Sequence, residues 1–365
     1  MTGGTRPLIV EELGADLAGQ FGALEAGLRG APFDEAPFRV AAFDFFDRCV
    51  TAGVNPDPFF NWIGTLALPL PGTPLAVMGL WEWALAIVHE WEDAAPGRRV
   101  HKGTGYYFAG MRDIALGNID RGFLYMHQAA VEDRLSTGDP MPPRPAIWFI
   151  TLDPRDPNQA YHDKVREYEA YLEAQLAAYR DSGRGGLTIA SLRERLGRHD
   201  ELLDVMTTIA HTVARASSLG NPRTKRIRSS DFAALILSEV ALELCLVLEE
   251  LMLRASGSPG GTFHPLATWY APQAGMPLTG PELGQLNGRF RNAFDRTVAE
   301  VLDGRQVATF SRSLSELESD LVVAYGVRNR SAHGLERPTA LSVEFDRLLP
   351  RLYFAAFAAF EALYP

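Results

Sequence analysis

Apolar residues recur at the three- and four-residue spacing of an amphipathic helix through most of the chain. The segments 38–51 and 79–97 each place their large apolar side chains on one helical face. The segment 103–135 predicts two helices that are broken around Gly117-Asn118, with Asp120 able to cap the second. No run alternates polar and apolar residues around a hairpin dipeptide, so we expect no β-sheet.

The C-terminal half predicts long helices that pack as an antiparallel bundle. Glycine and proline in this half fall between the apolar runs rather than inside them. The one long loop that we expect covers 257–281. The predicted helices are approximately 200–218, 229–254, 281–303, 311–333 and 341–363.

A proline-rich stretch separates the two halves. Six prolines surround the apolar run AIWFITL within 136–158, and because proline cannot continue a helix, we expect an ordered connector packed on the body of the protein. A charged helix at 158–180 follows, and the sequence DSGRGG at 181–186 indicates a flexible break. The prediction is an all-α protein with an irregular helical-hairpin domain at 1–180, a linker with a short helix at 181–198, and a helical bundle at 199–365.

Length and composition are those of a globular protein with room for two domains. Of 365 residues, 47% are apolar and 22% are charged, which excludes global disorder. Two cysteines, Cys49 and Cys245, suit a reducing cytosol, and neither cysteines nor histidines show metal-ligand spacing. The N-terminus lacks a signal-peptide pattern, and the longest apolar helix candidate, 232–253, carries too many polar residues to span a membrane. We therefore expect a cytoplasmic protein without a membrane segment.

The charge balance limits how the protein can bind nucleic acid. A formal net charge of −10 argues against a general polyanion binder, because such affinity rests on clustered lysine and arginine. Any contact with RNA should therefore be local. One candidate RNA-binding cluster stands directly before a predicted helix, although its residues also suit a solvated loop. These residues are Arg223, Lys225, Arg226 and Arg228.

The most informative residues lie at the end of the predicted helix 311–333. Its apolar stripe places four polar residues in the last turn: Arg328, Asn329, Arg330 and His333. The helix dipole there favours cations, so a protonated His333 is stabilised. Arg328 and His333 are five residues apart, about 140° around an ideal helix, and share no face unless the helix is distorted or a second copy completes the site. Asn329 and His333, four residues apart, share a face.

This arrangement resembles the signature of the HEPN superfamily (higher eukaryotes and prokaryotes nucleotide-binding). The signature is an arginine followed, after four to six residues, by a histidine, often with a polar residue directly after the arginine. Here four residues separate Arg328 from His333, and Asn329 takes the polar position. The resemblance covers roughly 199–365. It implies a homodimeric, metal-independent endoribonuclease that needs no cofactor.

The resemblance also implies RNA cleavage through attack of the ribose 2′-OH on the neighbouring phosphate. Histidine titrates near neutral pH, which suits His333 to the acid or base role, and the guanidinium fork of Arg328 suits phosphate oxygens. Arg330 is a further candidate RNA contact. Glu239 and Glu243, four residues apart on an otherwise apolar helix, either orient Arg328 or belong to a buried ion pair with no role in chemistry.

The segment 103–135 resembles a single tetratricopeptide-type hairpin, because its small residues fall near the small-residue positions of that repeat. We therefore expect the N-terminal domain to sense a signal or bind a partner. Many HEPN proteins act in phage defence or in toxin systems, which implies a regulatory protein or an antitoxin as that partner. The alternative is a catalytically silent helical scaffold that binds RNA, nucleotide or a protein.

Overall fold

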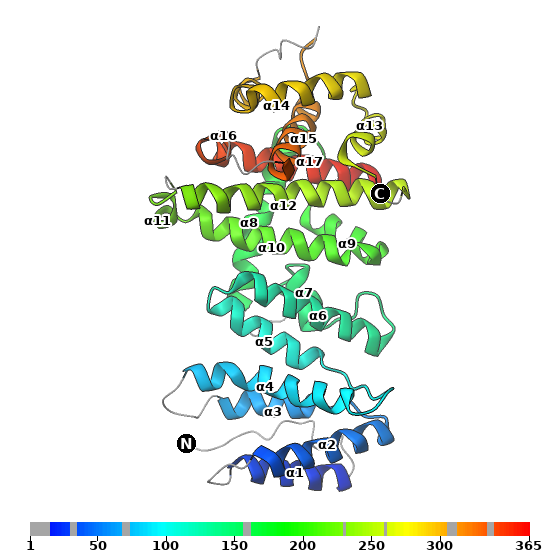
Figure 1. Cartoon of the computed structure of the whole chain (residues 1–365). Coiled ribbons are helices and arrows are strands. Elements are labelled where there is room, and N and C mark those ends of the chain that lie inside the picture. The colour runs from blue at the N-terminus through cyan, green and yellow to red at the C-terminus, as the bar shows by residue number, and fades with distance from the viewer. Residues whose placement is uncertain are drawn as a thin grey trace. The chain divides into compact units, whose positions relative to one another are not determined.

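A computed structural model shows how these segments fold (Figure 1). It describes residues 15–29, 35–67, 74–155, 162–228, 231–258, 261–304, 312–333 and 339–365. All regular structure in these ranges is helical, which confirms the predicted all-α class. None of the described helices combines the length and the apolar character that a membrane crossing requires. The chain divides into two compact units, of which the first extends to Ile150 and the second contains His162–Pro365.

The N-terminal unit is a succession of helices that pack mainly on their neighbours in sequence. They are α1 (Ala15–Arg29), α2 (Glu35–Ala52), α3 (Asp57–Ala67), α4 (Pro74–Asp93), α5 (Gly103–Ala115), α6 (Ile119–Thr137) and α7 (Pro145–Ile150). The predicted break at Gly117-Asn118 separates α5 from α6, but the N-cap residue of α6 is Asn118, and Asp120 lies in the first turn. A Cβ atom on Gly110 of α5 would lie 2.8 Å from the carbonyl oxygen of Gly122 in α6, so this close approach requires glycine.

Aromatic side chains form much of the core of this unit. Phe46 of α2 is fully buried and meets Phe59 of α3 and Trp91 of α4 edge to face. Burial of one such side chain stabilises the fold by about 1.5–3 kcal/mol. Phe149 of α7 is also fully buried and packs on Phe123 of α6. The described part of the proline-rich connector is therefore ordered, and α7 within it packs on the body of the unit, as expected.

A buried histidine joins the beginning of α3 to the end of α6. The side chain of His101 is 8% exposed; its Nδ1 lies 3.0 Å from Asp57 Oδ1, and its Nε2 lies 2.9 Å from Asp133 Oδ1. Burial alone would lower the pKa of the imidazole, but the hydrogen bonds and charges of Asp133 and Asp57 outweigh burial and raise the pKa of His101 to about 9. The ring is therefore protonated at neutral pH and bridges two carboxylates.

This bridge predicts that the stability of the N-terminal unit decreases as the pH rises from about 6.5 to about 9. Because folding raises the pKa of His101 from its ordinary value of 6.5, the contribution of the bridge is fully present below pH 6.5 and is lost as the pH passes about 9. Thermal unfolding across this range should show a decrease in midpoint that is absent in His101→Gln. If the midpoints of the wild type and of His101→Gln changed in parallel with pH, His101 would not form a charged bridge.

The C-terminal unit contains all five of the predicted long helices. Its elements are α8 (His162–Asp181), α9 (Ile189–Arg198), the short 3-10 helix η2 (Asp200–Leu202), α10 (Leu203–Gly220), α11 (Pro222–Lys225), α12 (Asp231–Ser256), α13 (Phe263–Gln273), α14 (Gly280–Leu302), α15 (Glu316–His333), α16 (Thr339–Val343) and α17 (Phe345–Leu363). The prediction of a long loop at 257–281 is wrong, because α13 occupies its middle. Pro265 lies in the first turn of α13, where a helix tolerates proline.

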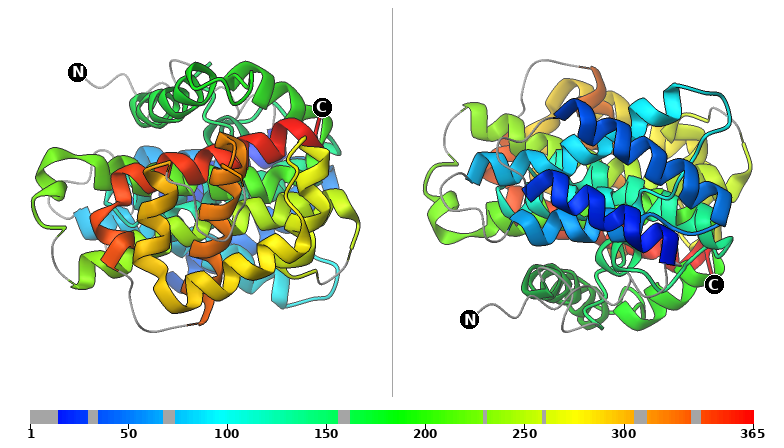
Figure 2. Two further views of the ribbon diagram at one scale, coloured as in Figure 1. Left: turned by 90° about the horizontal axis from the view of Figure 1, so that it is seen from above. Right: turned by 90° about the horizontal axis from the view of Figure 1, so that it is seen from below.

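The helices α12 and α15 form the centre of this unit (Figures 1 and 2). The long helix α12 contacts α10, α13, α15, α16 and α17, and α15 packs against α12, α13, α14 and α17. Residues 321–327 of α15 are all buried, so this stretch is covered around its whole circumference rather than on one stripe.

The two units divide earlier in the chain than the sequence predicts. Helix α8, which falls within the predicted N-terminal domain, packs on α10 and α17. The expected flexible break at 181–186 is instead held by the bundle, since Arg184 Nε lies 2.6 Å from Asp320 Oδ2 of α15 and the backbone N–H of Gly186 donates to Glu361 of α17 at 3.0 Å. The boundary predicted at 181–198 is therefore corrected to the segment between Ile150 and His162. Glycine-rich composition does not reveal that its arginine pairs with a buried carboxylate.

Candidate functional site

The last turns of α15 line a cavity of about 900 Å³ together with α13 and α14. Three predicted site residues, Arg328, Asn329 and Arg330, line it. The other lining residues are Thr262, Phe263 and His264 around the start of α13, Asn287, Phe290, Arg291 and Asn292 of α14, and Tyr325 of α15. His333 is the last residue of α15, and its side chain lies outside the described residues.

A kink in α14 lies directly beside the polar residues that this helix contributes. The backbone of Ala293 leaves the helical region, with φ −150° and ψ 55°, immediately after Arg291 and Asn292. The carbonyl oxygen of Ala293 accepts a hydrogen bond of 2.7 Å from the hydroxyl of Thr297, so this carbonyl is satisfied despite the distortion. Arg291 and Asn292 are both exposed and form part of the cavity wall.

Glu249 of α12 holds Arg328 in a bidentate ion pair. Nε of Arg328 donates to Oε2 of Glu249 at 2.9 Å, and Nη2 donates to Oε1 at 3.0 Å. The two side chains are only 22% and 13% exposed, so the pair is largely shielded from water. This parallel geometry fixes the orientation of the guanidinium group and stabilises its charge. The ion pair occupies the edge of the guanidinium that Nε and Nη2 form. The N–H groups of Nη1 lie on another edge and take no part in this pair.

Of the two interpretations of Glu239 and Glu243, orientation of Arg328 is wrong, and membership of an ion pair is the one that the structure shows. Arg215 of α10 binds both carboxylates instead, Glu239 at 2.9 Å and Glu243 at 2.5 Å. The reason is helical phase, because Glu249 follows Glu243 by six residues, which turns it about 240° around α12. Glu239 and Glu243 therefore lie on the side of α12 that packs on α10, and Glu249 lies on the side that packs on α15.

A chain of polar contacts links the three helices that line the cavity. Asn329 Nδ2 of α15 donates to Asn287 Oδ1 of α14 at 3.2 Å. Tyr325 Oη lies 3.0 Å from His264 Nδ1 of α13. Burial raises the pKa of Tyr325, and a hydrogen bond with Asn329 acts in the opposite direction. These contacts place a histidine and two amides in the same cavity as Arg328.

Sequence reasoning missed four polar residues that the site uses: Glu249, His264, Asn287 and Arg291. The nearest signal for His264 was the segment 257–281, whose prolines and glycines indicated a loop. No local spacing connects His264 with Arg328, because the two residues lie on separate helices. Only the packing of α13 and α14 on α15 brings them together.

The basic cluster at 223–228 lies away from this cavity. Lys225 and Arg228 both pair with Asp346 of α17, at 2.9 Å and 2.8 Å, while Arg223 and Arg226 are exposed. The cluster precedes α12, and Glu249 lies 18 residues into that helix, which corresponds to about 27 Å along its axis. Figure 1 accordingly shows α11 beside one end of α12 and α13 beside the other. An RNA contact by this cluster stays a prediction.

The comparisons leave this site without a relative. Family models, curated proteins and solved structures were compared with the chain, and no match was found. Among the described residues, no group of three or more histidine, cysteine, aspartate or glutamate side chains is placed to hold a metal ion.

The shielded ion pair predicts strong coupling between Arg328 and Glu249. Arg328→Ala should lower the free energy of unfolding by about 2–4 kcal/mol, because it leaves the Glu249 carboxylate largely buried without its partner. Glu249→Ala should then cost much less in the Arg328→Ala background than in the wild type. Urea denaturation of the four proteins measures this difference.

Arg198→Ala is the matched control, because its pair with Glu194 is exposed on both sides and should contribute less than about 1 kcal/mol. Equal costs of Glu249→Ala in both backgrounds would show that the pair does not couple.

Proposed function

We propose that this protein is a metal-independent endoribonuclease whose site is the cavity at the end of α15. One observation carries the proposal: Arg328 and Asn329 share a cavity with two further arginines, Arg291 and Arg330. Several arginines that line one cavity favour a phosphate-bearing ligand over a neutral one. His333, at the end of the same helix, supplies the titrating group that the resemblance to the HEPN superfamily implies.

In this proposal Arg328 stabilises the phosphate that reacts. Its Nε and Nη2 atoms are held by Glu249, so the remaining donors of the guanidinium are oriented before RNA binds. A preoriented donor needs little reorganisation as negative charge develops on the phosphate oxygens. Arg330 and Arg291 add positive charge along the cavity wall, and Asn329 offers a neutral donor.

His333 takes the acid or base role. The 2′-oxygen loses its proton and forms a bond to phosphorus, while the bond from phosphorus to the 5′-oxygen breaks and that oxygen gains a proton. The products are a 2′,3′-cyclic phosphate and a 5′-OH. The end of α15 favours the protonated imidazole through the helix dipole. One histidine serves one of the two proton transfers, and a second group must serve the other.

In the proposal, a homodimer brings His333 of one copy to Arg328 of its partner, and the second proton transfer is made with solvent water. Arg328 and His333 diverge by about 140° around α15, so the histidine of one copy reaches the phosphate held by the arginine of its partner more readily than its own. Two α15 ends facing one another would form two equivalent sites. The resemblance further suggests a cytoplasmic role in phage defence or a toxin system, restrained by a regulatory protein or an antitoxin.

The ion pair also favours a second candidate function. Because Glu249 neutralises Arg328, the cavity suits a scaffold that binds RNA, nucleotide or a protein partner without cutting RNA. The two functions differ in one respect, since a scaffold keeps its function when His333 is replaced.

The test is cleavage of a structured RNA in EDTA by the wild type, His333→Ala and His199→Ala. His199→Ala is the matched control, because His199 lies near the surface between Glu201 and Tyr364 and outside the cavity. We expect the wild type and His199→Ala to leave cyclic-phosphate ends, and His333→Ala to lose about two orders of magnitude or more in rate. Equal cleavage by all three proteins would exclude His333 from the chemistry. RNA binding without cleavage in every protein would favour the scaffold.

Mixing inactive variants tests the shared site. If the arginine of one copy acts with the histidine of its partner, mixed dimers of Arg328→Lys and His333→Ala contain one intact site and regain cleavage. If both residues act within one copy, mixed dimers contain no intact site and stay inactive. Light scattering of each protein checks that dimers form.

A further inference from the structure

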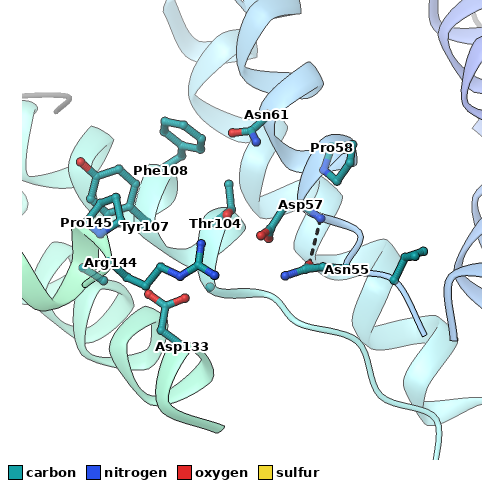
Figure 3. Close-up of a pocket in the computed structure, with 13 residues that line it drawn as sticks. Asn55, Asp57, Pro58, Asn61, Thr104, Tyr107, Phe108, Asp133, Arg144 and Pro145 are labelled. Carbon is teal, nitrogen blue, oxygen red and sulfur yellow. Dashed lines mark hydrogen bonds between the residues drawn. The ribbon is translucent and has the colours of Figure 1, made fainter. Parts of the chain in front are cut away.

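The N-terminal unit contains a second cavity, of about 570 Å³, at the beginning of α3 and α5 (Figure 3). The end of α6 and the start of α7 complete its wall. Its polar lining residues are Asn55, Asp57, Asn61, Thr104, Asp133 and Arg144, and its apolar ones include Pro58, Tyr107, Phe108 and Pro145. The proposed nuclease does not use this cavity, whose lining residues all belong to the N-terminal unit.

Two fixed carboxylates supply the acidic side of this cavity. The His101 bridge uses Oδ1 of Asp57 and Oδ1 of Asp133, and both carboxylates line the cavity. Asp57 is the more accessible of the two, with 18% of its side chain exposed against 8% for Asp133. A Cβ atom on Gly103 would lie 2.5 Å from His101 Nε2 and 2.6 Å from Asp133 Oδ1, so glycine is needed where this bridge crosses the start of α5.

A guanidinium group supplies the opposite charge. Arg144 directly precedes α7, is exposed, and forms no ion pair with any residue that the structure describes. In Figure 3 the Arg144 guanidinium and the Asp57 carboxylate both extend into the space beside Thr104. A positively charged hydrogen-bond donor and a negatively charged hydrogen-bond acceptor therefore face the same part of the cavity.

The charges of the lining residues limit which kinds of ligand the cavity can bind. A simple cation would meet Arg144, and a simple anion would meet Asp57 and Asp133, so each would be repelled by part of the lining. A zwitterion with its two charges close together is complementary to both sides. The apolar wall of Tyr107 and Phe108 suits a large apolar group next to the charged head, and small-molecule cavities commonly have this composition and size.

We propose that this cavity binds a free α-amino acid with a large apolar or aromatic side chain. The ammonium group donates to Asp57 and Asn61, and the carboxylate accepts from Arg144 and the hydroxyl of Thr104. The side chain lies against Phe108. The N-terminal unit is in this way a sensor of a small zwitterionic metabolite, and it requires no RNA and no second copy of the chain.

The test is isothermal titration of the full chain with phenylalanine and its two single-charge analogues, phenethylamine and 3-phenylpropionate. We expect phenylalanine to bind, and each analogue to bind about tenfold or more weaker, since each lacks one charge-assisted hydrogen-bonding group. Leucine and tryptophan extend the series in side-chain size. Absence of binding by every amino acid at millimolar concentration overturns the proposal, and so does equal binding of either analogue.

Two variants of lining residues test whether phenylalanine binds in this cavity. Arg144→Ala should weaken phenylalanine binding about tenfold or more without unfolding the protein, because Arg144 is exposed and pairs with none of the described residues. Asp57→Asn should act in the same direction but also removes one side of the His101 bridge, so its folding is checked by circular dichroism. Arg48→Ala is the matched control, because Arg48 is half-exposed, pairs with Asp44 of its own helix and does not line the cavity.

Binding that is unchanged by both Arg144→Ala and Asp57→Asn overturns the assignment to this cavity. Tighter binding of guanosine or adenosine monophosphate than of any amino acid overturns the zwitterion proposal as well. The titrations contain no RNA, so they succeed or fail independently of the nuclease proposal.

Discussion

The complete burial of residues 321–327 in α15 is the constraint on which the C-terminal unit depends. Residues 321–327 have no exposed face, so charge on this helix can be accommodated only at its two ends. At the beginning, Asp320 meets Arg184 and Arg351. At the end, Arg328 meets Glu249. The charged residues of the candidate site accordingly lie at the end of α15, where Glu249 of another helix reaches Arg328.

Buried charged residues are also paired within the N-terminal unit. Lys102 is buried and lies 2.6 Å from Glu92, and His101 bridges Asp57 and Asp133. In each unit some charged residues that line a cavity are held by partners distant in the chain, Arg328 by Glu249 and the two carboxylates Asp57 and Asp133 by His101, which fixes their positions before any ligand arrives. Preorganisation of this kind lowers the entropic cost of binding and is typical of sites rather than of plain surfaces.

Local patterns in the sequence were sufficient to predict the helices, but they did not predict which residues of different helices contact one another. The break at Gly117-Asn118 and the long helices of the bundle follow from spacing within a few residues. The partner of Arg328 does not, because Glu249 lies 79 residues earlier in the chain and competes with nearer glutamates of the same helix. Helix α13 was not predicted, because Pro265 and Pro272 within it indicated a loop. The segment nevertheless folds as a helix. The assignment of Arg328, Asn329 and His333 to RNA cleavage stays a prediction.

The contact between Arg184 and Asp320 decides where the chain can be cut. A fragment that begins at residue 199 would contain every residue of the candidate site but would lose Arg184, α8 and the hydrogen bond from Gly186 to Glu361. The Asp320 carboxylate, which is fully buried, would then keep only Arg351. Loss of activity in such a fragment would report a damaged bundle and not the removal of a sensor. A division before His162 separates the two effects.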